Sequence, residues 1–235
     1  MSIVPKTSRI SIVIPTLDEA ARLPATLQAV HALSGVEVLV VDGGSRDATV
    51  AVALAHGARV LTAPPGRARQ MNAGAAAASG GILLFLHADT VLPAGFVEQA
   101  RRALAGPQVV AGAFRLGFAG DAAPGLGIVA WGANLRSRWL QLPYGDQAIF
   151  LARERFLAVG GFPELPLLED VALVRNLRRQ GRIVLLSQAV TTSDRRWRQR
   201  GVVANTLKNL LILMGFFWGV APRRLAVWYR LGEEG

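Results

Sequence analysis

The chain has 235 residues, of which 51% are hydrophobic and 18% are charged. This composition predicts a folded chain with a sizeable core, because disordered chains have fewer apolar residues. The formal net charge of +10 comes almost entirely from arginine, and there is no cysteine. Disulfides, thiolate metal sites and a cysteine nucleophile are therefore excluded. A coding bias could explain the arginines; a functional explanation is a partner such as nucleic acid, an anionic lipid surface or a nucleoside diphosphate.

The first ninety residues alternate between predicted strands and predicted helices. Short apolar runs predict strands over 9–15, 36–42, 58–62 and 81–87. The helices between them are predicted to pass through Leu23, Leu27 and Val30, to run from a cap at Ser45 to Gly57, and to cover 67–79. Such alternation predicts a parallel sheet with helices on both faces. In a sheet of this kind the ligand lies beyond the carboxyl ends of the strands.

The pattern after Asp89 is less regular. It predicts a helix over 96–104, a strand over 109–118 with one exposed face, a helix or mobile insert within 119–143, a strand after YGDQ, a helix that begins near Glu169, a strand from 182, and a loop over TTSDRRWRQRG. There are no repeats and no obvious linker. We therefore predict one domain over residues 1–200 and an apolar, basic helical extension over 201–235, packed on the domain, on a partner subunit or on the membrane surface.

Polar residues follow each of the first four predicted strands. They are Thr16, Asp18, Glu19, Asp42, Arg67, Arg69, His87 and Asp89. Asp42 closes the second strand, where the acidic residue of a nicotinamide dinucleotide site would meet a ribose hydroxyl. The G-x-G-x-x-G fingerprint of such a site is missing, as is the phosphate-binding P-loop. An acid in this place still suits another nucleotide, because a carboxylate accepts from uracil N–H or ribose hydroxyl groups.

Five segments in order resemble family 2 glycosyltransferases of the GT-A fold, over about residues 9–200: SIVIPTLDEA, VLVVDGGSRDAT, FLHADT, YGDQAIF and LLEDVAL. GRARQMNAGA and DRRW are similar, more narrowly, to a bacterial single-domain subgroup associated with arsenosugar biosynthesis. The resemblance implies an α/β fold with a Rossmann-like, mostly parallel sheet and helices on both faces, plus the C-terminal helical extension. It also implies a metal-dependent, inverting transfer of a sugar from a nucleoside diphosphate, UDP by expectation, to a small-molecule or lipid-linked hydroxyl acceptor.

The catalytic residues that the resemblance implies are acidic. The family holds Mn²⁺ or Mg²⁺ with a D-x-D motif, which is HAD here, so Asp89 matches the metal ligand and His87 replaces the first aspartate. A capping aspartate in a surface turn is the alternative for HADT. The Glu169–Asp170 pair matches the family's E-D pair, with Asp170 as the base and Glu169 in support. Acids in a first helical turn also favour the helix dipole whatever the function.

Other matched residues are assigned to binding. The donor side is expected to include Pro15, Thr16, Glu19, Asp42, Arg67, Arg69, Gln70, His87, Ala88 and Arg196. The acceptor or sugar side is expected to include Gly145, Asp146, Gln147 and Trp197. Ser193 stands where processive members have the glutamine of Q-x-x-R-W, which argues against a polymer synthase. The DRRWRQR segment could instead lie on membrane phosphates, and at least one of Arg67 and Arg69 could be a solvated surface residue.

The remaining expectations concern location and partners. The start of the chain lacks the pattern of a secretory signal, so we expect a cytoplasmic protein. Residues 209–222 are uncharged but too short to span a bilayer, which predicts either an interfacial helix on the inner face of the membrane or a helix packed on the domain or in a homodimer. A non-catalytic sugar-nucleotide-binding protein is the main rival function. A nucleic-acid-binding protein is the weaker rival, because acids at the strand ends would repel a polyanion.

Overall fold

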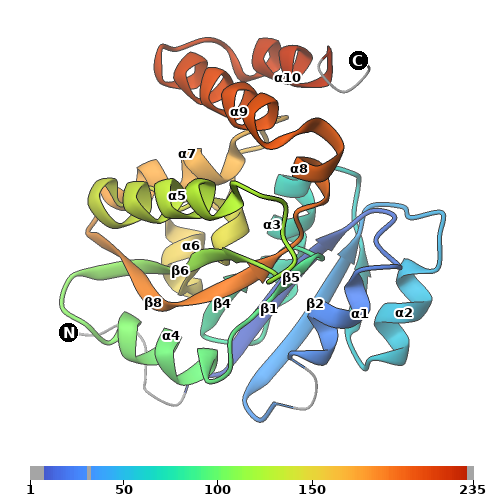
Figure 1. The fold of residues 1–235 in the computed structure, drawn as a ribbon. Helices are drawn as coiled ribbons and strands as arrows, with labels where there is room; N and C mark the ends of the chain where they lie inside the picture. The colour runs from blue at the N-terminus through green and yellow to red at the C-terminus, as the bar shows by residue number, and fades with distance from the viewer. Residues whose placement is uncertain (1–7, 31–32, 232–235) are drawn as a thin grey trace.

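The computed structural model describes residues 8–30 and 33–231 (Figure 1). In this part of the chain, eight strands form one sheet in the order β3-β2-β1-β4-β7-β6-β8-β5. The strands are β1 Ile10–Thr16, β2 Val36–Asp42, β3 Arg59–Thr62, β4 Ile82–Phe85, β5 Thr90–Val91, β6 Val109–Phe118, β7 Phe150–Ala152 and β8 Arg182–Thr192. The helices are α1 Leu23–Gln28, α2 Thr49–Ala55, α3 Arg67–Ala77, α4 Phe96–Leu104, α5 Leu126–Leu140, α6 Arg153–Ala158, α7 Glu169–Arg178, α8 Arg195–Arg200, α9 Val202–Phe217 and α10 Pro222–Leu231, with a 3₁₀ turn, η1, at Gly145–Gln147.

The first half of the sheet is parallel, as predicted. β3, β2, β1 and β4 lie side by side, and β1 is paired with β2 along its whole length. Apolar side chains fill both faces of β1, whose residues are all buried except the partly buried Pro15. The carboxyl ends of these strands meet at one edge of the sheet, and the polar residues that follow them are therefore gathered there.

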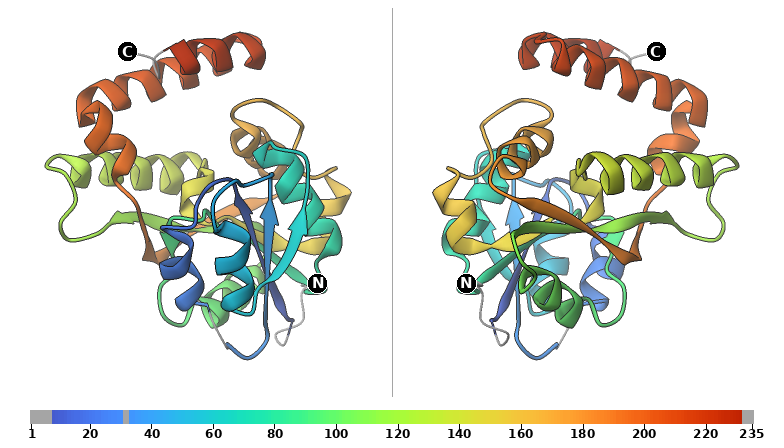
Figure 2. Two further views of the ribbon diagram at one scale, coloured as in Figure 1. Left: turned by 90° about the vertical axis from the view of Figure 1, so that its right-hand side faces the viewer. Right: turned by 90° about the vertical axis from the view of Figure 1, so that its left-hand side faces the viewer.

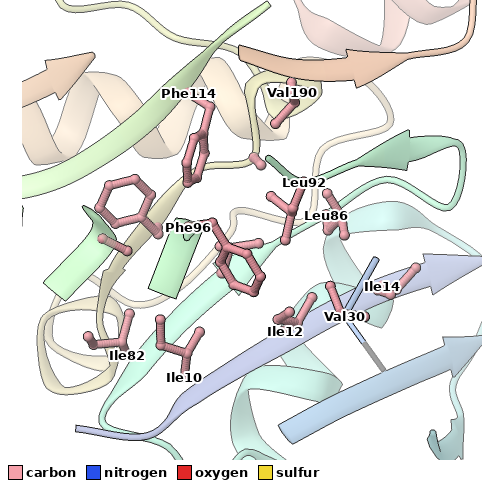
Figure 3. Packing of buried hydrophobic residues seen from close by; sticks show 14 of the residues in the cluster. Ile10, Ile12, Ile14, Val30, Ile82, Leu86, Leu92, Phe96, Phe114 and Val190 are labelled. Carbon is pink, nitrogen blue, oxygen red and sulfur yellow. The ribbon is translucent and has the colours of Figure 1, made fainter. Parts of the chain in front are cut away.

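Helices cover both faces of the sheet and enclose two hydrophobic clusters. On one face, α1, α2 and α4 share a cluster with residues of β1 and β4; Figure 3 shows this cluster around Ile12, Ile82 and Phe96. On the other face, α3 packs on β1, β2 and β3, α6 on β7, and α7 on β6 and β8. The second half of the sheet differs, since β7 is antiparallel to β4 and β6, whereas β8 is parallel to β6.

Four local predictions were wrong. Ser45 does not cap α2, because it is hydrogen-bonded to Asp42. The helix begins at Thr49, whose backbone amide and hydroxyl group both donate to Asp47. The fourth strand ends at Phe85, two residues early. β6 lacks the predicted exposed face because it is central in the sheet and contributes side chains to both hydrophobic clusters. The predicted loop at 191–201 is the end of β8 followed by α8.

The C-terminal segment forms two helices. The apolar run of 209–222 was predicted as one helix, but the chain turns after α9, where Gly219 adopts a positive φ of 84°, and then forms α10. Both helices lie at one end of the molecule, away from the sheet (Figures 1 and 2). No helix among the described residues has the length and apolar content needed to cross a bilayer.

Candidate active site

The loops after β1 and β2 are held together by three polar side chains. The Asp18 amide donates to Ser45 Oγ at 2.9 Å, and Asp18 Oδ1 accepts from the Arg46 amide at 2.7 Å. Asp47 Oδ2 accepts from the Ala20 amide at 3.0 Å. Asp18 adopts a positive φ of 54°, which aspartate tolerates better than most residues. The two loops therefore form one unit at the edge of the sheet.

Asp42, at the end of β2, lies at the base of this unit. Its Oδ2 accepts from the amides of Gly44 and Ser45, both at 2.9 Å, and its Oδ1 accepts from the Ser45 and Thr16 hydroxyls. Burial opposes ionisation, but these hydrogen bonds outweigh it and lower the pKa of Asp42. Asp42 is thus a buried carboxylate whose oxygens are satisfied by the protein.

Helix α3 connects this loop unit to a second polar region. The Gln70 amide nitrogen donates to the carbonyls of Thr16 and Val41, both at 2.8 Å. Gly74 lies against β1, and a Cβ there would approach Val13 Cγ1 to 2.4 Å. A glycine is needed for the helix to lie so close to the strand. This contact places Arg67, the first residue of α3, beyond the carboxyl end of the sheet.

Arg67, His87 and Asp170 converge on the backbone of Gly145. A Cβ on Gly145 would lie 3.0 Å from His87 Nε2, 3.1 Å from Asp170 Oδ2 and 3.2 Å from an Arg67 terminal nitrogen. The Gly145 amide donates to Asp170 Oδ2 at 2.6 Å, and the Arg67 guanidinium contacts His87 Nε2 directly. Four segments far apart in sequence thus meet at one point, and a larger residue at 145 would press on all three side chains.

Arg67 is the cation of this cluster. Its Nε lies 3.4 Å from Glu169 Oε1. Burial lowers the pKa of an arginine, but Glu169, Asp170, Asp146 and Asp89, in that order, raise the pKa of Arg67 above its ordinary value. The single positive charge of the guanidinium therefore lies among four acidic side chains. Asp89 belongs to this group, as expected for a residue placed at the same edge.

Two of the surrounding acids each have one buried oxygen that accepts no hydrogen bond. Asp146 Oδ1 and Glu169 Oε1 have no hydrogen-bond partner in the protein. Burial and the neighbouring Asp170 raise the pKa of both acids, opposed by Arg136 and Arg67 at Asp146 and by Arg67 at Glu169. Buried unpaired oxygens cost stability, and such groups gather at functional sites.

Some predicted residues lie outside this cluster. Arg69 is half exposed and pairs with Glu164 at 3.0 Å, and Glu19 pairs with Arg22 at 3.0 Å. Gln147 is fully buried, where it contacts Ser137 and the Phe114 carbonyl and so holds the η1 turn. Pro15 and Ala88 contribute backbone at the strand ends, and the Ala88 carbonyl accepts from Thr26. Trp197 packs edge-on against Phe118, with 6.4 Å between ring centroids; the Arg196 side chain lies outside the described part of the structure.

Sequence reasoning missed Tyr144 and Arg136. The Arg136 guanidinium lies 3.5 Å from the centre of the Tyr144 ring, and the buried Tyr144 hydroxyl has no hydrogen-bond partner. Burial raises the pKa of Tyr144 to about 12, so the hydroxyl keeps its proton. Its position directly before Gly145 was the available signal. Asp18, Ser45 and Asp47, which join the two loops, were visible only as polar residues after strands.

A family model for glycosyl transferase family 2 matches residues 11–159, well over half of the chain. The chain belongs to glycosyl transferase family 2. An uncharacterised glycosyltransferase of Mycobacterium tuberculosis (strain H37Rv) is 41% identical over 87 residues, which are 37% of this chain and 39% of that protein. The match thus spans well under two thirds of the relative's length.

Solved structures confirm the predicted GT-A fold. A mannosyltransferase from Pyrobaculum calidifontis, in complex with GDP-Man and Mn²⁺, aligns with a TM-score of 0.64 at 20% identity, over 86% of this chain and 64% of that one. Glucosyl-3-phosphoglycerate synthase from M. tuberculosis, in complex with Mn²⁺, UDP and glucosyl-3-phosphoglycerate, aligns with a TM-score of 0.60 at 22% identity, over 87% and 79%. At these identities the likeness concerns the fold.

Proposed function

We propose that this family 2 member transfers a sugar from a nucleoside diphosphate sugar to a hydroxyl acceptor, with inversion at the anomeric carbon. The observation that supports this most is the convergence of Arg67, His87 and Asp170 on Gly145. A cation, a proton acceptor and unpaired buried oxygens lie together at the sheet edge where ligands of this fold class bind. The nucleotide-bound mannosyltransferase and glucosyl-3-phosphoglycerate synthase share this fold.

The donor would lie across helix α3, with its nucleoside at the loop unit and its diphosphate at Arg67. Thr16 and Asp42 fix the loops at the nucleoside end, while Gln70 ties those loops to α3. Arg67 offers a guanidinium that suits phosphate oxygens. UDP is our expectation for the nucleotide. Arg69 points to Glu164, outside the cluster, whereas Arg67 lies at the sheet edge beside Gly145, so we assign the phosphate contact to Arg67 in preference to Arg69.

The residues near the diphosphate position fit a divalent metal. No group of three or more acids or histidines close enough to hold an ion is found among the described residues. Mg²⁺ in nucleotide sites is commonly held by only one or two carboxylates together with substrate phosphates. Asp89 would supply a carboxylate and His87 an imidazole nitrogen, a set that also suits Mn²⁺. When bound, the metal would neutralise charge on the leaving diphosphate.

In this proposal Asp170 accepts the proton of the acceptor hydroxyl. Its Oδ2 is oriented by the Gly145 amide and its Oδ1 by the Val171 amide at 2.8 Å. As the acceptor oxygen forms its bond to the anomeric carbon, the bond from that carbon to the diphosphate oxygen breaks, and the hydroxyl proton passes to Asp170. The nucleoside diphosphate leaves with the bonding electron pair. Glu169 holds Arg67 beside the reacting groups.

Asp146, Gly145 and the Tyr144 hydroxyl border the acceptor or sugar side in this proposal. Asp146 Oδ1 and Glu169 Oε1, which accept no hydrogen bond within the protein, would accept hydrogen bonds from hydroxyl groups of the substrates. Trp197 and Arg196 stay proposed contributors from α8. A small acceptor of the kind handled by the arsenosugar-associated subgroup is a finer proposal, which rests only on the GRARQMNAGA and DRRW segments.

We also propose that residues 1–200 form the catalytic domain and 201–235 an extension. This division is supported by the two hydrophobic clusters, whose buried members end at Val190. The first seven and last four residues of these ranges lie outside the described residues. A cytoplasmic location follows from the proposed donor, because nucleoside diphosphate sugars are supplied in that compartment.

Removal of the Asp89 carboxylate is the decisive test of the proposed reaction. The Asp89→Ala variant should lose transfer and metal-dependent binding of nucleoside diphosphates, measured by product formation and by calorimetry with and without Mn²⁺. Asp121→Ala removes a carboxylate that is largely exposed and is the matched control. Full activity of Asp89→Ala with the metal chelated would refute the assignment. A wild-type protein that binds UDP with Mn²⁺ but never hydrolyses or transfers a donor sugar would favour the non-catalytic rival.

A further inference from the structure

The two C-terminal helices expose a continuous apolar stripe. On α9 the exposed side chains recur at helical spacing and include Val203, Leu207, Leu210, Leu211, Met214 and Phe217. Trp218, at the end of this helix, is 82% exposed. In contrast, α3, α4 and α7 bury their large apolar side chains against the sheet, although α5 also exposes Ile128, Trp131 and Trp139. An apolar stripe of this length on a helix that is otherwise well formed requires a covering partner.

Helix α10 extends the same surface. Leu207 and Leu211 of α9 line a hollow of about 510 Å³ together with Trp228 of α10, so the indole faces the stripe. Trp228 is half exposed. Arg223 and Arg224 are also exposed and lie one turn before Val227 and Trp228 on α10. An arginine pair next to tryptophan and aliphatic side chains is the composition of a helix that lies in a membrane interface.

The charge of this region identifies the partner. Residues 195–231 contain eight arginines or lysines and no acidic residue, whereas 1–194 contain 18 basic and 14 acidic residues. Two glutamates follow at 233 and 234, outside the described residues. A second copy of the chain would bring two such basic surfaces together, which is unfavourable. A bilayer with anionic headgroups would attract the same charges and cover the apolar stripe.

We propose that α9 and α10 form a docking surface for an anionic lipid bilayer. The surface is connected to the candidate active site by a short segment. β5 and β8 pair at Thr90 and Thr192, and the Ser193 amide donates to the Asp89 carbonyl at 3.2 Å. Arg175 of α7 lies over the Phe216 and Phe217 rings, 5.7 and 5.5 Å from their centres, which ties the docking surface to the domain.

Flotation with lipid vesicles tests the proposal on the full chain. Vesicles of phosphatidylcholine mixed with phosphatidylglycerol should bind the protein at low salt, and pure phosphatidylcholine vesicles should bind it much more weakly. Leu211→Glu should reduce binding at least about tenfold, since a charge would enter the interface. Leu54→Glu is the matched control on α2, because Leu54 and Leu211 are 58% and 61% exposed. Equal loss in both variants, or none in either, would contradict the proposal.

Charge and self-association are tested separately. Arg223→Ala combined with Arg224→Ala should lower vesicle binding about tenfold or more, while the exposed control pair Arg102→Ala and Arg182→Ala should change it little. Absence of binding to anionic vesicles at low salt would overturn the proposal. So would a dimer, seen by light scattering, that Leu211→Glu dissociates. Binding of UDP in the same variants distinguishes a failure of docking from a failure of the proposed catalytic function.

Discussion

Two groups of carboxylates lie at the same edge of the sheet and differ in how the protein satisfies them. Asp42 accepts four hydrogen bonds from its own loop and from Thr16, and its pKa is lowered. Glu169 is equally buried and Asp146 partly buried, but each keeps a buried oxygen without a hydrogen bond, and their pKa values are raised. The first group shapes a loop, whereas the second is left unsatisfied for a ligand to complete.

The comparison shows that carboxylates at one edge of the sheet can either stabilise a loop or remain available to a ligand. A carboxylate whose two oxygens accept hydrogen bonds from amides and hydroxyl groups, as in Asp42, adds stability and fixes a conformation. A carboxylate buried beside other acids costs stability and is retained where it can act on a substrate. Arg67 partly offsets that cost. Among the described residues it is the only cation whose pKa is raised by all four acids, Glu169, Asp170, Asp146 and Asp89.

The largest expected effect belongs to Asp170. The Asp170→Asn variant keeps the size of the side chain and removes its ability to take a proton, so turnover should fall about 10²- to 10⁴-fold. Donor binding should persist, because Asp170 is assigned to the acceptor hydroxyl. Steady-state rates and calorimetric binding of UDP measure the two quantities. A turnover within a few-fold of the wild-type value would remove Asp170 from the role of base.

The effect of Asp42 should appear in stability. In Asp42→Asn the amides of Gly44 and Ser45 lose their charged acceptor, which should lower the free energy of unfolding by about 2 kcal/mol at neutral pH. The pKa of Asp42 is lowered in the folded protein, so its ionisation stabilises the fold above the ordinary value of 3.8 and that gain is lost as the pH falls through the folded pKa. Urea unfolding at several pH values measures this difference. An equal loss at acidic and neutral pH would show that charge is not the cause.

Asp146 should behave in the opposite way, with the smallest effect. Its pKa is raised, so the folded state binds the proton more tightly, and stability falls as the pH rises above the ordinary value of 3.8. Asp146→Asn removes the buried charge and should raise the melting temperature at neutral pH by roughly 2 to 4 °C. The gain should shrink towards acidic pH. A variant less stable than the wild type at neutral pH would show that the charge of Asp146 is satisfied within the protein.

Much of the fold could be predicted because local patterns and long-range packing agree. Every residue from Ile10 to Ile14 except Ser11 is apolar, which is typical of a strand buried on both faces. The order of the strands in the second half could not be predicted, because the pairing of β7 between β4 and β6 depends on contacts distant in sequence. The same holds for β6, whose burial comes from its central place in the sheet.

The sequence predicted which residues belong to the site better than it predicted which of them are in contact. The motifs indicated Arg67, Asp89 and Asp170, and the structure brings Arg67 and Asp170 together at Gly145. They could not show that Gln147 is buried or that Arg69 faces Glu164, since both facts depend on side-chain direction at the start of a helix or turn. Tyr144 was missed because a single tyrosine beside a motif has no periodic signal.

The segment after β8 has a consequence for how acceptors would be chosen. Asp194 accepts from the Ala123 amide at 2.9 Å and pairs with Arg198 at 2.6 Å, so the segment between β8 and α9 is fixed to the domain at Asp194. If α9 and α10 dock on a bilayer as proposed, this fixed segment, unlike a loose tether, would hold the reaction centre at a set height above the headgroups. Acceptors would then be sorted by how far their hydroxyl group stands from the bilayer.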